Sequence, residues 1–431
     1  MRVVLINKSD TTGGAAVVSR RLMEALRQEG VDARMLVTEK LSDSPYVELA
    51  APKSLIKRKF ISERLKIFMA NGFNRKTLFK IDTGAEGLPL WKHPVVKEAD
   101  AVLLNWVNQG MVSLRGVRKI LKLGKPVIWT MHDMWCMTGI CHHAGECIHY
   151  FRECGYCPFL EGKASHKDLS YKIHRKKSKL YGWGKKKSNI AFVAVSNWLK
   201  EKSLESSLLK DMRVEVIPNA FKPMAGKDQT DLTALQLRND EGRKIKILFG
   251  AARLDDPIKG LDTLKEASKI LLEKYTELAS SLEIAMFGGI KDKKTLKGFA
   301  LPLVELGIVK GEENVAKIYR EADIVVSASS YETLPGTLVE AQAYGCVPVS
   351  FLRGGQADII DHLVSGYLAK YDEDLAARAE NLAEGIVWAA SIVRNSLRKA
   401  AIKENMAQMV EQRFSYQSVA RKYLQLIESM L

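Results

Sequence analysis

Short apolar runs alternate with longer amphipathic stretches along the whole chain, and this alternation limits the fold more than any other feature. Alternating strands and helices are typical of parallel sheets covered by helices. At 431 residues the chain exceeds what one hydrophobic core usually supports. The sequence therefore predicts an α/β protein with two doubly wound, Rossmann-like domains. The expected strands are residues 3–6, 33–37, 101–104, 127–130 and 192–195, then 246–250, 283–287, 308–309, 323–327 and 347–350.

The connection between the two domains is expected at residues 214–226, which contain two prolines and end in glycine. We expect an N-terminal domain over residues 1–205 and a C-terminal domain over residues 206–415. The last segment, 416–431, has an uninterrupted helical pattern and is expected to pack back onto the first domain. Ligands of such sheets bind outside the carboxyl ends of the strands, so a site facing a cleft between the domains is expected.

Positive charge is concentrated in the first half of the chain. Of the formal net charge of +16, residues 1–200 carry +18 and residues 201–431 carry −2. This charge suits an anionic surface, although a solvated lysine-rich face is the alternative. Residues 55–68 mix apolar and basic side chains, but Lys57 and Arg64 interrupt the apolar face of the expected helix. Peripheral contact with an anionic membrane is therefore a candidate property of this half.

Other features of the composition bear on location and partners. No apolar run approaches the ~18 residues that a membrane-spanning helix needs, and the first ten residues resemble a strand and a polar loop rather than a signal peptide. A cytoplasmic location is expected. A nucleic-acid partner is not expected, because no zinc-finger spacing with a recognition helix and no aromatic RNA-binding motif is found.

Residues 331–345, YETLPGTLVEAQAYG, place two carboxylates on either side of a strand-to-helix turn. Residues 337–343 are expected to form a helix, and the free N–H groups at its start suit a phosphate. Glu332 precedes this helix and Glu340 lies about one turn inside it. Carboxylates that flank a phosphate site would bind hydroxyl groups, which points to the ribose and sugar of a nucleotide diphosphate sugar.

Three further motifs follow expected strands. Gly13 and Gly14 would let the backbone approach a ligand at a helix start, although an ordinary strand-to-helix turn uses glycine too. Arg253 and Lys259 follow a strand of the second domain and could neutralise a diphosphate; surface ion pairs with nearby aspartates are the alternative. His132 follows a strand of the first domain, where a purely structural histidine is the alternative.

Five of the six cysteines fall within residues 136–157, and four of them form the pattern C-x5-C-x6-C-x2-C. In a cytosolic chain this cluster favours zinc over disulfides, with unligated or redox-active thiols as the alternative. Four cysteine ligands would leave no open position for catalysis, so the zinc would be structural. The candidate ligands are Cys141, Cys147, Cys154 and Cys157.

Taken together, these motifs resemble the family 4 (group 1) glycosyltransferases of the two-Rossmann-domain, or GT-B, class, over nearly the whole chain. The cysteine-rich insertion looks like that of a bacterial subgroup that builds surface polysaccharides. The residues that carry the resemblance are the Gly13–Gly14 loop, the pair His132 and Asp133, residues 195–198 and 217–220, Arg253 with Lys259, and Glu332 with Glu340, which have the spacing of the family's E-x7-E motif.

The resemblance implies a retaining transfer of a sugar from a nucleotide diphosphate sugar. Arg253 and Lys259 would bind the diphosphate, Glu332 the transferred sugar and Glu340 the ribose. His132 would contact the donor sugar and help to stabilise the transition state. The amides of Gly336, Thr337 and Leu338, together with Gly13 and Gly14, would meet the phosphates. No metal or other cofactor is required for the reaction under this reading, because the cations stabilise the leaving diphosphate.

The resemblance also implies partners. A UDP-sugar is the favoured donor and a GDP-sugar the alternative, while the acceptor would be a lipid-linked or glycan intermediate in capsule, exopolysaccharide or lipopolysaccharide assembly. The sequence departs from the family pattern at two positions. Ala220 stands where many members have glycine, which leaves the nucleotide and sugar of the donor open. Asn105 stands where this subgroup often has histidine, so no role is supported for that position. A nucleotide-sugar epimerase, a sugar-phosphate synthase and a catalytically silent nucleotide-binding protein are the alternatives.

Overall fold

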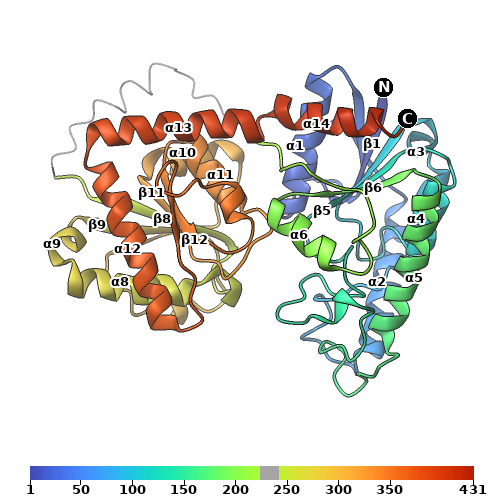
Figure 1. The fold of residues 1–431 in the computed structure, drawn as a ribbon, viewed down its shortest axis with the longest axis horizontal. Coiled ribbons are helices and arrows are strands. Elements are labelled where there is room, and N and C mark those ends of the chain that lie inside the picture. Colours follow the sequence, from blue (N-terminus) through green and yellow to red (C-terminus); the bar gives the residue numbers. More distant parts are fainter. Residues whose placement is uncertain (224–241) are drawn as a thin grey trace. The chain divides into compact units, whose positions relative to one another are not determined.

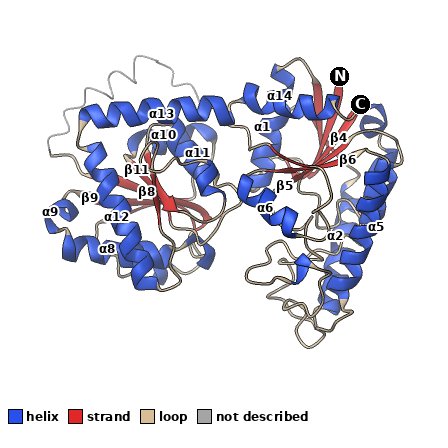
Figure 2. Ribbon diagram, in the orientation of Figure 1, coloured by secondary structure: helices blue, strands red, loops and turns tan. Residues whose placement is uncertain are grey.

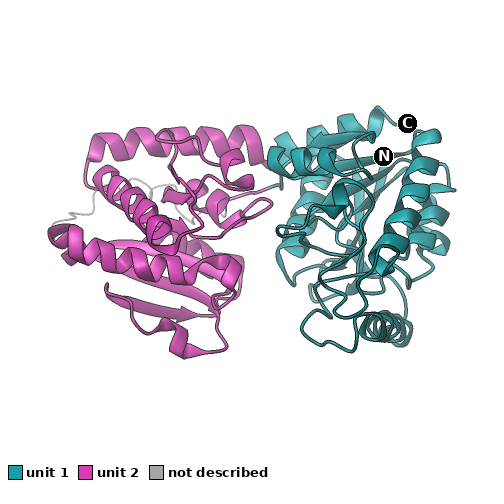
Figure 3. Cartoon of the chain, turned by 60° about the horizontal axis from the view of Figure 1, so that its bottom comes forward, with its two compact units in different colours: residues 1–220, 416–431 teal, residues 221–415 magenta. Residues whose placement is uncertain are grey.

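The computed structural model describes residues 1–223 and 242–431, which form two compact units. The first unit comprises Met1–Ala220 and Tyr416–Leu431, and the second comprises Phe221–Ser415 (Figure 3). Each unit contains a sheet with helices packed against it (Figure 2). All strand pairs in both sheets are parallel, so the predicted fold class is confirmed.

The first unit is built on a seven-stranded sheet of order β3-β2-β1-β4-β5-β6-β7. Strand order reverses between β1 and β4, which is the doubly wound arrangement. Its strands are β1 Arg2–Ser9, β2 Asp32–Glu39, β3 Val47–Leu49, β4 Ala101–Leu104, β5 Val127–Met131, β6 Ile190–Ala194 and β7 Val214–Val216. Its helices are α1 Gly14–Gln28, α2 Lys53–Ala70, α3 Pro94–Glu98, α4 Leu114–Leu121, α5 Leu169–Lys186, α6 Asn197–Glu205 and α14 Tyr416–Glu428.

Helix α14 completes the core of the first unit. Its buried side chains, among them Val419 and Ile427, share one apolar cluster with α1 and the central strands. Figure 1 shows α14 beside α1, and Tyr416 donates a hydrogen bond of 2.9 Å to Glu24 of α1. The last helix of the chain is therefore an integral part of the unit that the first residues begin.

The second unit has a six-stranded sheet of order β10-β9-β8-β11-β12-β13, which reverses between β8 and β11. Apolar side chains of β8 alternate between two clusters: Ile247 and Phe249 pack towards α8 and α12, and Leu248 packs towards α10 and α11. Its strands are β8 Ile245–Arg253, β9 Leu282–Gly289, β10 Leu303–Gly307, β11 Ile324–Ser327, β12 Val347–Phe351 and β13 Tyr367–Ala369. Its helices are α8 Leu261–Lys274, α9 Thr276–Ser280, α10 Glu312–Glu321, α11 Gly336–Ala343, α12 Leu375–Val393 and α13 Ser396–Phe414.

Several expected boundaries differ from the structure. Val214–Val216, expected within the interdomain connection, is strand β7 and pairs with β6, so residues 206–220 belong to the first unit. The strand expected at residues 308–309 instead ends at Gly307, since Leu303–Gly307 is the segment that pairs with β9. The end of the expected connection, from residue 224 onward, lies outside the described residues.

Candidate active site

The clearest candidate for chemistry in the second unit is the contact between Lys259 and Glu332. The Lys259 ammonium lies 2.5 Å from Oε1 of Glu332, and Ser329 donates to the same oxygen at 3.0 Å. Lys259 follows β8 and Glu332 follows β11, the two strands between which the strand order reverses. In open parallel sheets this point at the carboxyl edge is where ligands bind. The structure therefore brings these two predicted site residues together.

Two glycines allow the loops of this site to approach one another closely. Gly260 has a φ of +73°, and a Cβ there would lie 2.0 Å from the carbonyl oxygen of Ala328. Gly354 has a φ of +83°, and its Cβ would lie 2.5 Å from the carbonyl oxygen of Glu332. Only glycine adopts such a conformation at so close a contact without strain. The backbone of Glu332 is further fixed because its carbonyl accepts the N–H of Gly355 at 2.8 Å.

The other two predicted charges have different neighbours. Arg253 lies at the end of β8 with about half of its side chain exposed, and its Nε donates to Asp255 at 3.0 Å. This is the aspartate pairing that the sequence left as an alternative. Burial raises the pKa of the Tyr319 phenol in α10, and the nearby carboxylate of Glu340, in the second turn of α11, raises it further. Arg253 thus lies at the end of β8, and Glu340 lies in the helix that follows β11, the two strands that the Lys259–Glu332 pair also follows.

Helix α11 begins beside this pair. Its N-terminal residue, Gly336, is exposed, and its N-cap residue, Pro335, makes no side-chain hydrogen bond to the helix. The amide of Leu338 donates to the carbonyl of Pro335 at 3.1 Å. The roles of the Gly336, Thr337 and Leu338 amides as hydrogen-bond donors to a phosphate stay predictions.

In the first unit, the Gly13–Gly14 loop joins β1 to α1. Both glycines are exposed, and a Cβ at either would meet no atom within 4 Å. Gly13 nevertheless has a φ of +90°, which favours glycine on conformational grounds. The turn itself therefore explains Gly13, while the space around Gly14 is open to a ligand.

His132 follows β5 and is partly buried. Its Nε2 lies 3.2 Å from Oδ1 of Asn105, the first residue after β4. Removal from water lowers the pKa of His132 to about 4, against the opposing effect of Asp133. His132 is therefore a neutral ring at physiological pH. The buried amide nitrogen of Asn105 has no hydrogen-bond partner among the described residues, and the side chains of Asn105 and His132 line a small cavity with Thr130, Asn219 and Tyr423.

A chain of buried charges next to His132 was not predicted. The ring of His142 lies 2.7 Å from Asp133 through Nδ1 and 3.1 Å from Asp82 through Nε2. Trp106 stacks on that ring and donates its indole N–H to Asp133 at 2.8 Å, while Arg64 pairs with Asp82. Asp82 lies in an irregular segment without a recognisable pattern, and His142 lies among cysteines whose spacing predicts metal binding. The pair His132 and Asp133 was the one sequence motif that indicated a functional role for part of this network.

The titration of this network follows from its geometry. Burial would raise the pKa of Asp133, but the charge and hydrogen bond of His142 lower it to about 2. Burial would lower the pKa of His142, but Asp133 and Asp82 raise it to about 9. The network therefore holds an imidazolium between two carboxylates at neutral pH.

The four cysteines of the predicted zinc site line one small cavity in the first unit. All four carry free thiols. In the described parts of the chain, no three potential ligands are already gathered closely enough to hold a metal ion. The zinc prediction therefore stays a prediction.

Comparison with known proteins gives the family. The model for glycosyl transferases group 1 matches residues 236–404, and the model for glycosyltransferase family 4 matches residues 12–223. This chain belongs to the family 4 (group 1) glycosyltransferases. The predicted family is thus confirmed, whereas the cysteine-cluster subgroup stays a prediction.

Individual relatives match shorter segments. This glycosyltransferase is 29% identical over 185 residues to the uncharacterized glycosyltransferase MJ1607 of Methanocaldococcus jannaschii, covering 40% of this chain and 45% of that protein. It is 32% identical over 152 residues to the amylovoran biosynthesis glycosyltransferase AmsK of Erwinia amylovora, covering 31% and 34%. It is 26% identical over 162 residues to mannosylfructose-phosphate synthase of Agrobacterium fabrum, covering 35% of each. The matches thus span less than half of each relative.

Solved structures support the GT-B fold of this glycosyltransferase. Anabaena HepE in complex with UDP has a TM-score of 0.60 at 14% identity, with 100% of both chains covered. WaaG, a glycosyltransferase involved in lipopolysaccharide biosynthesis, has a TM-score of 0.60 at 14% identity, with 99% of both chains covered. At these identities the likeness shows the fold.

Proposed function

We propose that this glycosyltransferase moves a sugar from a nucleotide diphosphate sugar, with UDP as the favoured nucleotide, to a lipid-linked or glycan acceptor in bacterial surface polysaccharide assembly. The observation that carries the proposal is the Lys259–Glu332 contact at the reversal of strand order, close in sequence to the start of α11. HepE, whose solved structures contain UDP and UDP-glucose, supports UDP over GDP.

In this proposal each residue of the site has a defined role. Lys259 and Arg253 neutralise the diphosphate as it leaves, which is where negative charge develops. The amides of Gly336 and Thr337 bind a phosphate, and Gly14 leaves room for one. Glu332 binds hydroxyls of the transferred sugar, and Glu340 binds those of the ribose. Neutral His132 donates a hydrogen bond to the donor sugar.

The same proposal includes retention of anomeric configuration and no metal in the chemical step. The bond between the anomeric carbon and the diphosphate oxygen breaks, the acceptor oxygen bonds to the same face of that carbon, and the departing phosphate takes the acceptor's proton. The lysine and arginine charges are what make a metal unnecessary. No carboxylate is assigned as a covalent nucleophile.

A decisive experiment follows the fate of the donor. The purified chain is incubated with a panel of UDP- and GDP-sugars, thermal shift identifies the donor that stabilises it, and NMR of the product reports the anomeric configuration. We expect Lys259→Ala to lower kcat by roughly 10²–10³. The control Lys274→Ala, which removes an exposed lysine paired with Glu380, should leave kcat unchanged. Failure of every nucleotide sugar to bind would overturn the proposal.

One alternative acceptor is favoured by a specific observation. Mannosylfructose-phosphate synthase is among the relatives, so a sugar phosphate is a second candidate acceptor. Separate reactions with lipid-linked diphosphate sugars and with hexose phosphates distinguish the two. Conversion of the donor without any acceptor would instead identify an epimerase.

We also propose that the first unit contacts an anionic membrane at a cytoplasmic surface. Of the apolar side chains on and after α2, five are 45–62% exposed: Ile61, Leu65, Met69, Phe73 and Phe79. Exposed basic residues accompany them: Lys57, Arg58, Lys66, Arg75, Lys76 and Lys80. We call these eleven residues the α2 face. Apolar side chains that enter the lipid, surrounded by cations that bind anionic headgroups, suit attachment to a bilayer surface.

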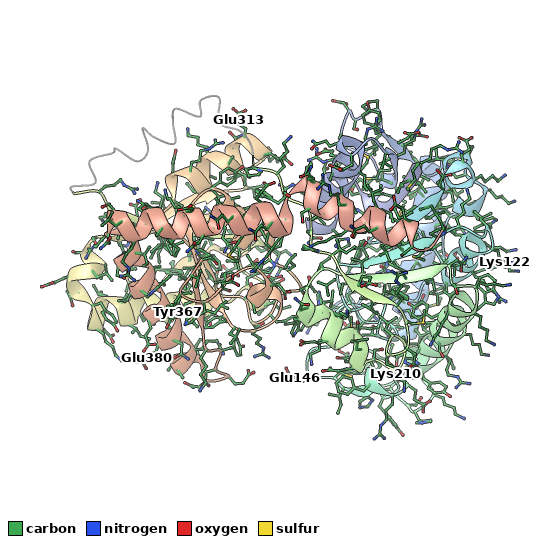
Figure 4. All side chains as sticks on the ribbon, turned by 45° about the horizontal axis from the view of Figure 1, so that its top comes forward. Lys122, Glu146, Lys210, Glu313, Tyr367 and Glu380 are labelled. Atoms are coloured by element: carbon green, nitrogen blue, oxygen red, sulfur yellow. The ribbon has the colours of Figure 1, made fainter. Side chains whose placement is uncertain are left out.

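The structure corrects one sequence-based objection to this face. Arg64, expected to interrupt the apolar stripe, is buried and pairs with Asp82, so it points away from the exposed side. Lysines elsewhere on the unit, such as Lys122 and Lys210, reach its surface (Figure 4). None of the described helices is long and apolar enough to cross a bilayer.

A further inference from the structure

Four cysteine side chains from a short irregular segment surround one cavity. The lining includes Gly139, His149, Tyr150 and Ser170 in addition to the four thiols. The thiols come from separate turns of the chain; Cys141, for example, pairs with Ile81 through an isolated β-bridge. The four-thiol cavity is lined by Cys141, Cys147, Cys154 and Cys157.

The turn that carries two of the thiols is held in an unusual conformation. Cys154, Gly155 and Tyr156 all have positive φ, at 54°, 119° and 45°. Positive φ is uncommon for residues other than glycine, so contacts must hold the turn in place. Gly155 donates to Ser170 at 3.0 Å and Cys157 donates to Asp168 at 2.9 Å. Both acceptors belong to the start of α5, which therefore fixes the C-x2-C turn.

A backbone group is already directed at sulfur. The amide of Gly139 donates to Sγ of Cys154 at 3.2 Å. A Cβ at position 139 would lie 2.5 Å from the carbonyl oxygen of Ser170 and 3.2 Å from the same sulfur, so only glycine fits there. Sulfur accepts such a bond better as thiolate than as thiol, because hydrogen bonds to charged groups are the stronger ones. The amide of Gly139 is thus in place to stabilise a thiolate at Cys154.

Independent support comes from a buried cation. The side chain of Lys177 is completely buried, and its ammonium donates to the carbonyls of Trp135 at 2.5 Å and Thr138 at 3.0 Å. The same nitrogen lies 3.4 Å from the centre of the Trp135 ring. These partners are neutral, and a buried charge with neutral partners is unfavourable unless opposite charge is near.

The groups that could supply this opposite charge are mostly thiols. Burial lowers the pKa of Lys177 to about 8, and Cys136, Cys141 and Cys154, followed by Asp133, act against that shift. Asp133 already holds the imidazole of His142 and the indole of Trp106. A zinc ion bound by four thiolates has a net charge of −2, so a neighbouring buried ammonium would offset part of it. Four neutral thiols would leave Lys177 without that compensation.

We propose that Cys141, Cys147, Cys154 and Cys157 bind one structural Zn²⁺, with Lys177 as the compensating charge. The softness of thiolate and the ligand count select zinc. Binding releases four thiol protons and requires the side chains to move closer together than they stand in the structure, where they do not yet form a coordinating group. This inference is independent of the proposed sugar transfer.

The site would have a structural consequence for its neighbour in the sequence. Cys141 immediately precedes His142, whose ring bridges Asp133 and Asp82. A metal that fixes Cys141 would fix the position of this ring. Loss of the metal would therefore destabilise residues 136–157 and, with them, the contacts of His142 with Asp133 and Asp82.

Metal analysis of the full chain tests the proposal. Protein purified without a metal-affinity tag from zinc-supplemented cells should contain about one zinc per chain by mass spectrometry, and thiol modification should release it. Cobalt substitution should give thiolate-to-cobalt charge-transfer absorption. Zinc far below one per chain in the wild type, with all thiols reacting freely, would overturn the site whether or not any variant folds.

Matched variants test the ligand set. Cys154→Ser and Cys157→Ser should each lose the zinc, whereas Cys346→Ser, at a buried cysteine of the second unit, should retain it. His149 lines the same cavity, and its Nδ1 lies 2.8 Å from the carbonyl of Gly155, which leaves Nε2 as a possible ligand. The four-thiol assignment requires that His149→Ala also retain the metal. Loss of zinc in His149→Ala together with retention in Cys147→Ser would overturn the four-thiol assignment.

Discussion

Lys259 and Glu332 form an ion pair across the two strands, β8 and β11, between which the order of the second sheet reverses. Each side chain is 22–29% exposed, so the pair stands at the surface of its site and can exchange partners with a ligand. A pair of this kind holds both groups in place before the ligand arrives. Pre-organisation of this sort reduces the conformational cost of binding.

The first prediction concerns this coupling. In a double-mutant cycle of Lys259→Ala and Glu332→Gln, we expect a coupling free energy on the order of 1 kcal/mol for unfolding, because the pair is partly solvated. Coupling for binding of the donor should be larger, since both groups contact it in the proposed function. Urea unfolding and calorimetric donor titration of the four proteins measure the two values. Additive effects on donor affinity would contradict the shared site.

The second prediction concerns Gly260. Gly260→Ala should lower the stability of the second unit by about 1–3 kcal/mol and weaken donor binding, because the new Cβ collides with the carbonyl of Ala328 and displaces Lys259. Gly298→Ala is the matched control: its φ is also positive, at +90°, but its nearest neighbour is a flexible lysine carbon at 3.7 Å. Equal losses of donor affinity in both variants would mean that the close contact is unimportant.

The sequence predicted the parts of the molecule that rest on local patterns. Apolar runs identify β1, β4, β5, β11 and β12 because buried parallel strands are continuous in hydrophobicity. The short strands β3, β7 and β13, of three residues each, have no such run and owe their pairing to the neighbouring strand. Strand β10 is largely exposed and therefore has no continuous apolar run. The apolar residues 308 and 309, just after it, led to the wrong prediction of a strand there.

The candidate site shows the same division. Lys259 and Glu332 could be paired in advance, because each follows a strand that the sequence predicts. The pairing of His142 with both Asp133 and Asp82 could not, since Asp82 is 60 residues away in an irregular segment. Arg64 illustrates the limit most clearly: helical periodicity placed it on a face, but only the fold shows that this face is buried.

The third prediction follows from the raised pKa of His142. A folded-state pKa of about 9 against about 6.5 in the unfolded chain means that the stabilisation is fully present below about pH 6.5 and is lost as pH rises through about 9. It amounts to on the order of 3 kcal/mol. His142→Gln should therefore be much less stable than wild type in urea at pH 6, and the difference should shrink by pH 9.5.

A control separates this effect from histidine loss in general. His166 lies 3.4 Å from Glu153 but its side chain is 58% exposed, so His166→Gln should change stability little at either pH. A His142→Gln deficit that stays constant between pH 6 and 9.5 would show that the ring acts by packing rather than by charge. Wild-type stability should fall over the same alkaline range.

The fourth prediction tests the α2 face with vesicles. The chain should sediment with vesicles that contain anionic lipid at low salt, and added salt should release it, since headgroup attraction is screened over about 8–10 Å at 0.1–0.15 M. Leu65→Ser with Met69→Ser should weaken binding without changing charge, because it removes apolar area that enters the lipid. Leu397→Ser, at an 82% exposed leucine of the second unit, should bind as wild type does.

The charges of the α2 face are tested separately. In Lys57→Gln with Lys76→Gln, binding should depend less steeply on salt concentration than in wild type, because fewer charges remain to be screened. Wild-type protein that stays in the supernatant at low salt would exclude this face as a membrane contact.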